Sequence, residues 1–266
     1  MKTKTKICAV IGSPISHSLS PVIHNAAFEY LQLPFHYRAL EFREPELAIK
    51  EMLEKNYRGY SVTLPLKTTV IKCLDNLDPL TKKIGAVNTI INEAGKLGGF
   101  NTDVSGAITS IQEKMDITRK RVVLLGAGGA ARAIGFGLKE KKAKIHIMNR
   151  TRKRAQKIAE DLQATFSDFK ADLLEGTDLI INTTPVGMYP HTNQSIIDEV
   201  PEGTIIMDIV YNPLETKLLK LAKRRGCRTI NGSAMFLYQA AEQFRLFTGN
   251  EPPLEIMKKT LLEKLT

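Results

Sequence analysis

Short apolar segments rich in β-branched residues alternate with amphipathic segments along almost the whole chain, and this alternation restricts the possible folds most. The apolar segments have the length of buried strands, and the segments between them repeat apolar residues with helical spacing. The predicted strands lie in "KICAVIG", "FHYRALEF", "GYSVTLP", "RVVLLGAGG", "KIHIMNR", "DLIINTT", "GTIIMDIV" and "RTING". Because parallel strands need crossover connections, the alternation predicts an α/β protein with parallel-type sheets.

A glycine cluster in "VVLLGAGGAARA" joins one of these strands to a helix. Glycine permits a tight turn and a close backbone approach to a pyrophosphate, and the helix N-terminus offers N–H groups and partial positive charge. The cluster alone is a weak signal, but its place within a strand–helix–strand unit favours a dinucleotide site. The predicted loop residues are Gly126, Ala127, Gly128, Gly129 and Ala130.

A basic run, "NRTRKRAQK", follows the second strand of this unit. NAD-binding units have an Asp or Glu here for the ribose hydroxyl, whereas this strand ends in Asn149, Arg150 and Thr151. An acid would repel a 2′-phosphate, but Arg150 can bind it or stack on the adenine, and Arg154 lies one helical turn further on. Thr151 is expected to cap the next helix and to donate a hydrogen bond to the phosphate. These residues predict NADP as the cofactor.

The net charge of +10 is concentrated in the same region. Residues 119–157 contain 13 Lys or Arg and one acid, Glu140, while the remainder holds 25 basic and 27 acidic residues. A general nucleic-acid binder more often spreads its positive charge along a face or tail, so we expect no nucleic-acid partner. Arg152 and Lys153 are expected to face solvent, away from the phosphate.

The predicted domains follow from these elements. A helix between Thr102 and Thr118 marks a boundary, with a substrate-binding and catalytic α/β domain at residues 1–103 and a Rossmann-type NADP-binding domain at residues 104–233. The helical segment 234–266 has no strand of its own. We expect it to complete the first domain, so that two lobes flank a cleft.

The composition excludes several classes of protein. Hydrophobic residues at 43% and charged residues at 25% are typical of a globular, core-forming chain. No apolar run approaches the roughly 18 residues that span a bilayer, and "ICAVIGSP" predicts a buried strand instead of a signal peptide. Cys8, Cys73 and Cys227 are far apart, so we expect neither a disulfide framework nor a metal site. We therefore expect a cytoplasmic protein without a membrane partner.

Polar residues cluster in short motifs of the N-terminal domain. Ser18 and Ser20 in "GSPISHSLSP" could donate to a carboxylate, although helix capping by Ser20 ahead of Pro21 would be favoured on this motif alone. Ser61, Thr63 and Lys67 stand in "GYSVTLPLK", Asn88 in "GAVNTI" and Asp103 in "GFNTD". A single lysine is usually only a surface charge, so the order of the motifs carries the argument.

In order and wording, eight segments resemble the shikimate dehydrogenase family along nearly the whole chain. They are "SPISHSLSP", "SVTLPLK", "GAVNTI", "GFNTD", "GAGGAARA", "NRTRKRA", "DIVYNPLETKLL" and "NGSAMFLYQ". The resemblance implies reversible, NADP-dependent reduction of 3-dehydroshikimate to shikimate. This reaction is a step towards chorismate and the aromatic amino acids, and it needs no metal.

The resemblance also implies roles for individual residues. In the family, the residues matching Lys67 and Asp103 form the catalytic pair, and those matching Ser18 and Ser20 hold the substrate carboxylate. The ring hydroxyls or their surroundings are contacted by the positions of Ser61, Thr63, Asn88, Tyr211 and Gln239. The positions of Ile209 and Gly232 lie against the cofactor.

The expected chemistry agrees with these residue types. Reduction of a ketone needs a hydride on carbon, which the cofactor supplies, and a proton on oxygen. Lys67 can polarise the carbonyl and donate the proton, and Asp103 can orient Lys67 and stabilise its charge. Ser61 departs from the family, which usually has Asn there, so a hydroxyl replaces an amide that contacts a substrate hydroxyl. Tolerance of quinate therefore stays open.

Three alternatives remain beside NADP-dependent shikimate dehydrogenase. The first is a quinate/shikimate dehydrogenase with broader substrate and cofactor use. The second is a non-catalytic, NADP-sensing regulator on the same fold, against which Lys67 and Asp103 argue. The third is a nucleic-acid binder, supported by the basic region alone. A monomer and a homodimer are both compatible with the sequence.

Overall fold

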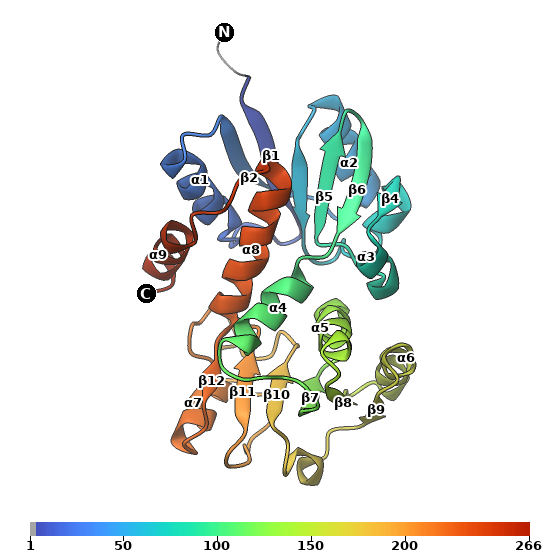
Figure 1. Ribbon diagram of the computed structural model, residues 1–266, viewed down its shortest axis with the longest axis vertical. Helices are drawn as coiled ribbons and strands as arrows, with labels where there is room; N and C mark the ends of the chain where they lie inside the picture. The colour runs from blue at the N-terminus through green and yellow to red at the C-terminus, as the bar shows by residue number, and fades with distance from the viewer. Residues whose placement is uncertain (1–3) are drawn as a thin grey trace. The chain divides into compact units, whose positions relative to one another are not determined.

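A computed structural model describes residues 4–266, which form two α/β units, each around a six-stranded sheet (Figure 1). The first unit comprises the described residues through Thr102 together with Gln239–Lys264, and the second comprises Asp103–Tyr238. The predicted α/β class with parallel-rich sheets is confirmed.

The first sheet has the strand order β2-β1-β3-β5-β6-β4. Its strands are β1 (Lys6–Gly12), β2 (Phe35–Glu41), β3 (Gly59–Val62), β4 (Asn76–Leu77), β5 (Thr89–Glu93) and β6 (Lys96–Phe100). β1 is parallel to β2 and β3, and β4 is parallel to β6, but β5 is antiparallel to both β3 and β6. The strand–helix alternation did not predict the reversed direction of β5. Ala94 and Gly95, with φ of 53° and 89°, close the tight hairpin that makes β5 antiparallel to β6.

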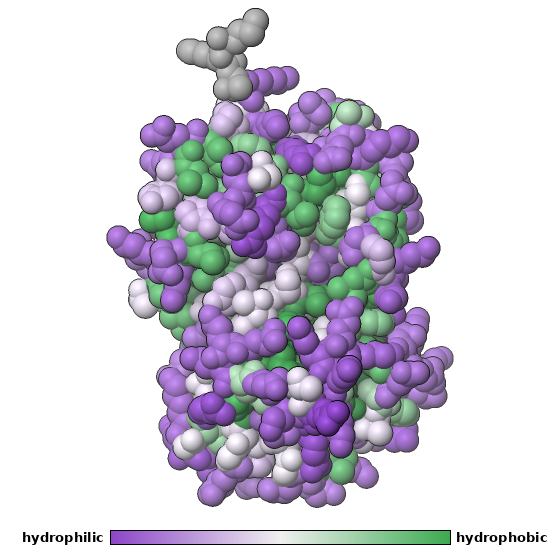
Figure 2. All heavy atoms as spheres, viewed as in Figure 1, coloured by the Kyte–Doolittle hydropathy of each residue, from purple (hydrophilic) through white to green (hydrophobic). Residues whose placement is uncertain are grey.

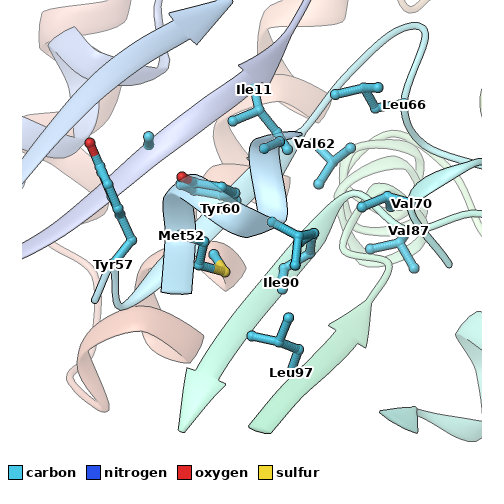
Figure 3. Packing of buried hydrophobic residues seen from close by; sticks show 13 residues of the cluster. Ile11, Met52, Tyr57, Tyr60, Val62, Leu66, Val70, Val87, Ile90 and Leu97 are labelled. Atoms are coloured by element: carbon cyan, nitrogen blue, oxygen red, sulfur yellow. The ribbon is translucent and has the colours of Figure 1, made fainter. Parts of the chain in front are cut away.

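The helices of the first unit cover both faces of its sheet. They are α1 (Ser20–Tyr30), α2 (Pro45–Glu54), η1 (Val70–Cys73), α3 (Pro79–Ile84), the later part of α8 (Gly232–Thr248) and α9 (Leu254–Leu265). Met52 of α2 packs against Ile11, Tyr60, Val62 and other buried side chains of the sheet (Figure 3). Alternate strand residues thus point to α2, as the two-residue period of a strand requires.

The other face of the same strands packs against α8. A Cβ added to Gly59 would lie 2.5 Å from a ring carbon of Phe247, so only glycine allows this approach. Arg58 Nε donates to the Phe247 carbonyl at 3.0 Å, and Arg58 Nη2 donates to the Leu246 carbonyl at 3.3 Å. These contacts attach the C-terminal helical segment to the first sheet.

The second unit has a fully parallel sheet in the order β12-β11-β10-β7-β8-β9. Its strands are β7 (Arg121–Leu125), β8 (Lys144–Met148), β9 (Thr165–Ser167), β10 (Leu179–Asn182), β11 (Ile205–Asp208) and β12 (Thr229–Ile230). Its helices are α4 (Asp103–Gln112), α5 (Gly129–Glu140), α6 (Arg152–Leu162), η2 (Ala171–Leu174), α7 (Lys217–Arg224) and the first turns of α8. Such a sheet gathers the residues after its strands at one edge.

A membrane span requires a helix that is both long and apolar. Across residues 4–266, every helix is too short or too polar to cross a bilayer. On the visible face in Figure 2, hydrophilic residues are spread among smaller hydrophobic areas.

Candidate active site

The turn after β7 is crowded on one side and open on the other. Gly126 has φ of +116°, and its N–H donates to the Met148 carbonyl at 2.8 Å. A Cβ at Gly126 would lie 2.6 Å from Thr183 Oγ1, whereas a Cβ at Gly128 or Gly129 would meet no atom within 4 Å. Glycine is therefore required at Gly126 by the fold, while the two later glycines leave space for a ligand.

The N-terminus of α5 faces this space with its backbone groups uncapped. Gly128 is the N-cap residue, so no side-chain hydrogen bond caps the helix, and the first turn contains no acid. Ala127 and Ala130 flank the turn with small, partly exposed side chains. Backbone N–H groups and a helix dipole at an open turn suit a pyrophosphate, so this loop fits a dinucleotide.

The basic residues after β8 are divided between two environments. Arg150 and Arg154 are exposed, and among residues 4–266 neither guanidinium has an ion pair or hydrogen bond. Arg152 instead lies over the Phe166 ring, 5.2 Å from its centroid, with Asp168 at 3.9 Å. Two unengaged guanidinium groups and no acid after β8 suit a 2′-phosphate.

Thr151 differs from the expectation. It is the N-cap residue of α6, but its side chain makes no capping hydrogen bond, so the predicted cap is wrong. Asn149 Nδ2 donates to the Thr151 carbonyl at 3.0 Å and fixes the backbone of the turn in its place. The Thr151 residue is exposed.

Two further backbone segments meet at this edge of the second sheet. A Cβ at Gly232 would lie 2.4 Å from the Ile209 carbonyl oxygen, so the start of α8 and the end of β11 are in close contact. The Ile209 N–H donates to the Asn182 carbonyl at 3.1 Å, which aligns the ends of β11 and β10. Ile209 and Gly232, predicted on the cofactor side, are thus brought together.

Asp208, at the end of β11, is a buried acceptor of several hydrogen bonds, and it was not among the residues predicted from the sequence. It accepts hydrogen bonds from Asn182 Nδ2 at 2.9 Å, Thr216 Oγ1 at 2.7 Å and the Val210 N–H at 3.1 Å. Burial raises the pKa of Asp208 to about 6 despite these bonds. The sequence signal that could have identified Asp208 is an acidic residue at the end of the apolar strand "TIIMD".

In the first unit, Ser18 and Ser20 follow β1, and Ser61 and Thr63 stand at the end of β3. The Thr63 N–H donates to the Ile11 carbonyl at 2.9 Å, which keeps the two strand ends together. Leu19, not Ser20, is the N-cap residue of α1, so the capping interpretation of Ser20 is wrong. The Ser20 N–H donates to Ser18 Oγ at 3.3 Å, and this contact holds the two serines of the loop together.

The segments of Lys67, Asn88 and Asp103 are connected through backbone and side-chain bonds. The Lys67 carbonyl accepts from the Val87 N–H at 2.7 Å, directly before Asn88. Asn88 Oδ1 accepts from the Thr102 N–H at 2.7 Å, and Asn88 Nδ2 donates to Thr102 Oγ1 at 2.9 Å. Thr102 precedes Asp103, the buried first residue of α4. Asn88 therefore fixes the residue before Asp103, while its neighbour Val87 fixes the backbone at Lys67.

Ser61 is connected to two buried residues that the sequence reasoning did not select. Its Oγ accepts from the Tyr37 hydroxyl at 2.5 Å and donates to Gln243 Oε1 at 2.7 Å. Gln243 Nε2 donates to the Asn88 carbonyl at 3.2 Å and to Thr89 Oγ1 at 3.1 Å. Gln243 is 182 positions from Ser61 in sequence, and its neighbours Glu242 and Arg245 are also polar, so no local pattern marked it.

The remaining predicted substrate residues, Tyr211 and Gln239, lie on different units. The Tyr211 ring packs on Phe236 with centroids 4.6 Å apart, and burial raises the pKa of its hydroxyl. Gln239 is a buried residue of α8 in the first unit. In the described part of the chain, no three His, Cys, Asp or Glu side chains form a metal-binding group.

Three segments of the chain match known families. Residues 10–90 match the "Shikimate dehydrogenase substrate binding domain", residues 109–217 match "Shikimate / quinate 5-dehydrogenase", and residues 232–262 match the "Shikimate 5'-dehydrogenase C-terminal domain".

Full-length relatives agree with these matches. The chain is 43% identical to the NADP(+) shikimate dehydrogenase of Methanosarcina acetivorans, over 98% of this chain and 99% of the relative. It is 42% identical to that of Bacillus cereus, with the same two coverages. The Thermus thermophilus shikimate 5-dehydrogenase, solved with NADP(H) and shikimate, superposes with a TM-score of 0.91 at 34% identity, covering 97% of this chain and 99% of that one.

Proposed function

Because the chain belongs to the shikimate dehydrogenase family, we propose that it catalyses the reversible, NADP-dependent reduction of 3-dehydroshikimate to shikimate. The observation that carries the proposal is the match to NADP shikimate dehydrogenases over 98% of the chain. The relatives' names favour shikimate over quinate. The enzyme is an oxidoreductase of the shikimate pathway.

NADP is the cofactor, and when bound it supplies or takes the hydride. We assign its pyrophosphate to the open turn at Gly126, Gly128 and Gly129 and the start of α5. The 2′-phosphate is assigned to Arg150 and Arg154, whose guanidinium groups are exposed. The remaining proposed contacts come from Ala127, Ala130, Asn149, Thr151, Ile209 and Gly232.

The substrate is proposed to bind at the end of the first sheet. Ser18 and Ser20 hold its carboxylate with their hydroxyl groups, supported by the hydrogen bond that joins the two residues. The ring hydroxyls and their surroundings are assigned to Ser61, Thr63, Asn88, Tyr211 and Gln239. Accordingly, residues 1–103 with the helices of 234–266 form the substrate domain, and residues 104–233 form the NADP domain.

Lys67 and Asp103 are proposed to move the proton. The Lys67 ammonium polarises the substrate carbonyl and donates the proton to its oxygen as the carbon is reduced, and in the reverse reaction it takes the proton back. Asp103 orients the ammonium and stabilises its charge. The fixed backbone around Asn88 supports this assignment, since both segments are bonded next to it.

We further propose a cytoplasmic location, with the enzyme acting on small molecules as a monomer or a homodimer. Cys8, Cys73 and Cys227 are free thiols, which suits a reducing compartment.

One assay tests the activity. Oxidation of shikimate and of quinate is followed by absorbance of the reduced cofactor, each with NADP and with NAD. We expect turnover to be fastest with shikimate and NADP. Preference for quinate would contradict the substrate assignment, and nucleotide binding without turnover of either acid would support the regulator instead.

A further inference from the structure

The buried amide of Gln243 has only one possible orientation. Its side chain is 2% exposed, and Nε2 lies 3.2 Å from the Asn88 carbonyl oxygen, which can only accept. Thr89 Oγ1 donates its single proton to Asn88 Oδ1 at 2.8 Å, so it also accepts from Gln243 Nε2 at 3.1 Å. Gln243 Oε1 must therefore face Ser61.

This orientation determines the role of the Ser61 hydroxyl. A hydroxyl has one proton and two lone pairs, whereas an amide oxygen only accepts. Ser61 must therefore give its proton to Gln243 Oε1 at 2.7 Å, and the Tyr37 hydroxyl, 2.5 Å away, must donate to Ser61. One lone pair of Ser61 is then left for a further partner.

The Tyr37 hydroxyl keeps its proton near neutral pH, because burial holds its pKa above the ordinary value. Its side chain is 1% exposed, and burial raises the pKa of its hydroxyl well above the ordinary value. Its ring stacks on His24 with centroids 4.4 Å apart and planes within 4°. Its backbone is held by Asn25, which exchanges two hydrogen bonds of 2.8 Å with it.

We propose that Gln243 is a positioning residue that makes Ser61 a hydrogen-bond acceptor, so that position 61 recognises a ring hydroxyl of the substrate by the proton that this hydroxyl donates. This rests on the proposed function, because it takes the substrate to lie at Ser61. An asparagine amide at position 61 could donate instead. The Ser61–Gln243 pair thereby determines that this position accepts a hydrogen bond from a ring hydroxyl and does not donate one.

The test uses shikimate analogues in which each ring hydroxyl, except the one oxidised, is replaced in turn by hydrogen or by fluorine. Fluorine can accept weakly but cannot donate. At the hydroxyl read by Ser61, both analogues should lose about three- to tenfold in kcat/KM, as expected for one neutral hydrogen bond. The ratio of kcat/KM for the fluoro analogue to kcat/KM for the deoxy analogue should be close to one in the wild type.

Two variants connect that ratio to Gln243. Gln243→Met keeps the length of the side chain but releases the Ser61 proton, so the fluoro analogue should gain about threefold over the deoxy analogue. Adding Ser61→Ala to Gln243→Met should return the ratio to one. Ser61→Ala alone should abolish the preference for shikimate over the deoxy analogue. If Gln243→Met fails to fold, the wild-type ratio of the fluoro and deoxy analogues still decides whether Ser61 acts as an acceptor.

The control is Asn92→Ala, which removes another buried amide of the same sheet, one that donates to the Tyr57 carbonyl at 3.0 Å. It should leave every analogue ratio unchanged. The inference is overturned if the wild type uses the fluoro analogue with a clearly higher kcat/KM than the deoxy analogue. It is also overturned if this ratio stays at one in Gln243→Met, or if Ser61→Ala still prefers shikimate to the deoxy analogue. A wild type that does not oxidise shikimate contradicts the proposed function instead.

Discussion

A methyl group on Gly126 would come within 2.6 Å of the Thr183 hydroxyl oxygen, whereas one on Gly128 would meet no protein atom within 4 Å. The two glycines of this turn are thus present for different physical reasons. The first is required by packing and by its φ of +116°, and the second is compatible with the fold as alanine.

Substitution should separate these causes. Gly128→Ala should keep the melting temperature of the wild type but weaken NADPH binding, because the added methyl enters the space assigned to the pyrophosphate. Gly126→Ala should lower the free energy of unfolding by about 1–3 kcal/mol, a usual cost of a strained backbone. Thermal melting and a fluorescence titration with NADPH measure both effects. Unchanged NADPH affinity in Gly128→Ala would remove the loop from the binding site.

Arg150→Ala should weaken NADP binding far more than NAD binding. A hydrogen bond to a charged group is worth about 1.5–3 kcal/mol, or roughly ten- to a hundredfold in affinity. Arg152→Ala is the matched control, because that guanidinium lies over Phe166 instead. Titrations of both cofactors decide the matter, and equal losses for NADP and NAD would contradict the 2′-phosphate assignment.

The double change Ser18→Ala and Ser20→Ala should raise the KM for shikimate by about tenfold or more, since two hydrogen bonds to a charged carboxylate are lost. The KM for NADP should stay the same. Ser13→Ala is the control from the same loop, because the Ser13 hydroxyl donates to Glu41 at 2.7 Å. If the NADP constant rises instead, the serines belong to the cofactor site or to the stability of the loop.

Lys67→Met should reduce turnover by roughly 10²- to 10⁴-fold, the usual contribution of a positioned general acid, while NADPH still binds. Methionine keeps most of the bulk of the side chain and removes the charge. Asp103→Asn should also lose activity, and the double variant should lose less than the product of the two factors, because the residues act together. Wild-type turnover in Lys67→Met would exclude Lys67 from the mechanism, and independent losses would refute the pair.

The burial of His24 predicts how the free energy of unfolding depends on pH. Its ring is fully buried between aromatic side chains, and burial lowers its pKa from 6.5 to about 3. Between these values the unfolded chain binds a proton that the folded chain does not, so stability is greatest above pH 6.5 and falls as the pH drops. The slope should approach 1.4 kcal/mol per pH unit.

The variant His24→Phe keeps an aromatic ring and removes the titration. Its free energy of unfolding, measured by denaturant titration from pH 7.5 to 4.5, should lack this contribution. The difference between variant and wild type should therefore change steadily below pH 6.5. A difference that is constant with pH would show that His24 has the same pKa in the folded and unfolded chain.

Local sequence patterns predicted most elements that lie on one continuous stretch. The segment "KICAVIG" coincides with β1, and "RVVLL" with β7. The hairpin of β5 and β6 was missed because Gly98 and Gly99 weaken the strand pattern, although "EAGK" is a usable turn signal. Its antiparallel direction is set by the length of the turn, which the strand–helix alternation does not report.

The candidate site was predictable only in part, for a related reason. The glycine turn and the arginines are contiguous in sequence, so their environment could be inferred from neighbouring residues. Gln243 and Asp208 acquire their roles from partners on other elements, and burial then decides which hydrogen bonds they make. The Thr151 side chain makes no capping bond, and Leu19 precedes α1 as its N-cap residue, and neither result follows from the residue type alone.

Because β5 runs in the reversed direction, the residues beside Asn88 and the hairpin turn lie at opposite ends of this strand. Thr89 begins β5 beside Asn88, while the exposed Ala94–Gly95 turn closes the hairpin at its other end. Five strand residues at about 3.4 Å each place the turn roughly 17 Å from the beginning of β5. A short flexible peptide inserted between Ala94 and Gly95 would lengthen the hairpin away from the catalytic segments. This turn is therefore a suitable attachment point for a fluorophore or a surface tether on an enzyme that keeps working.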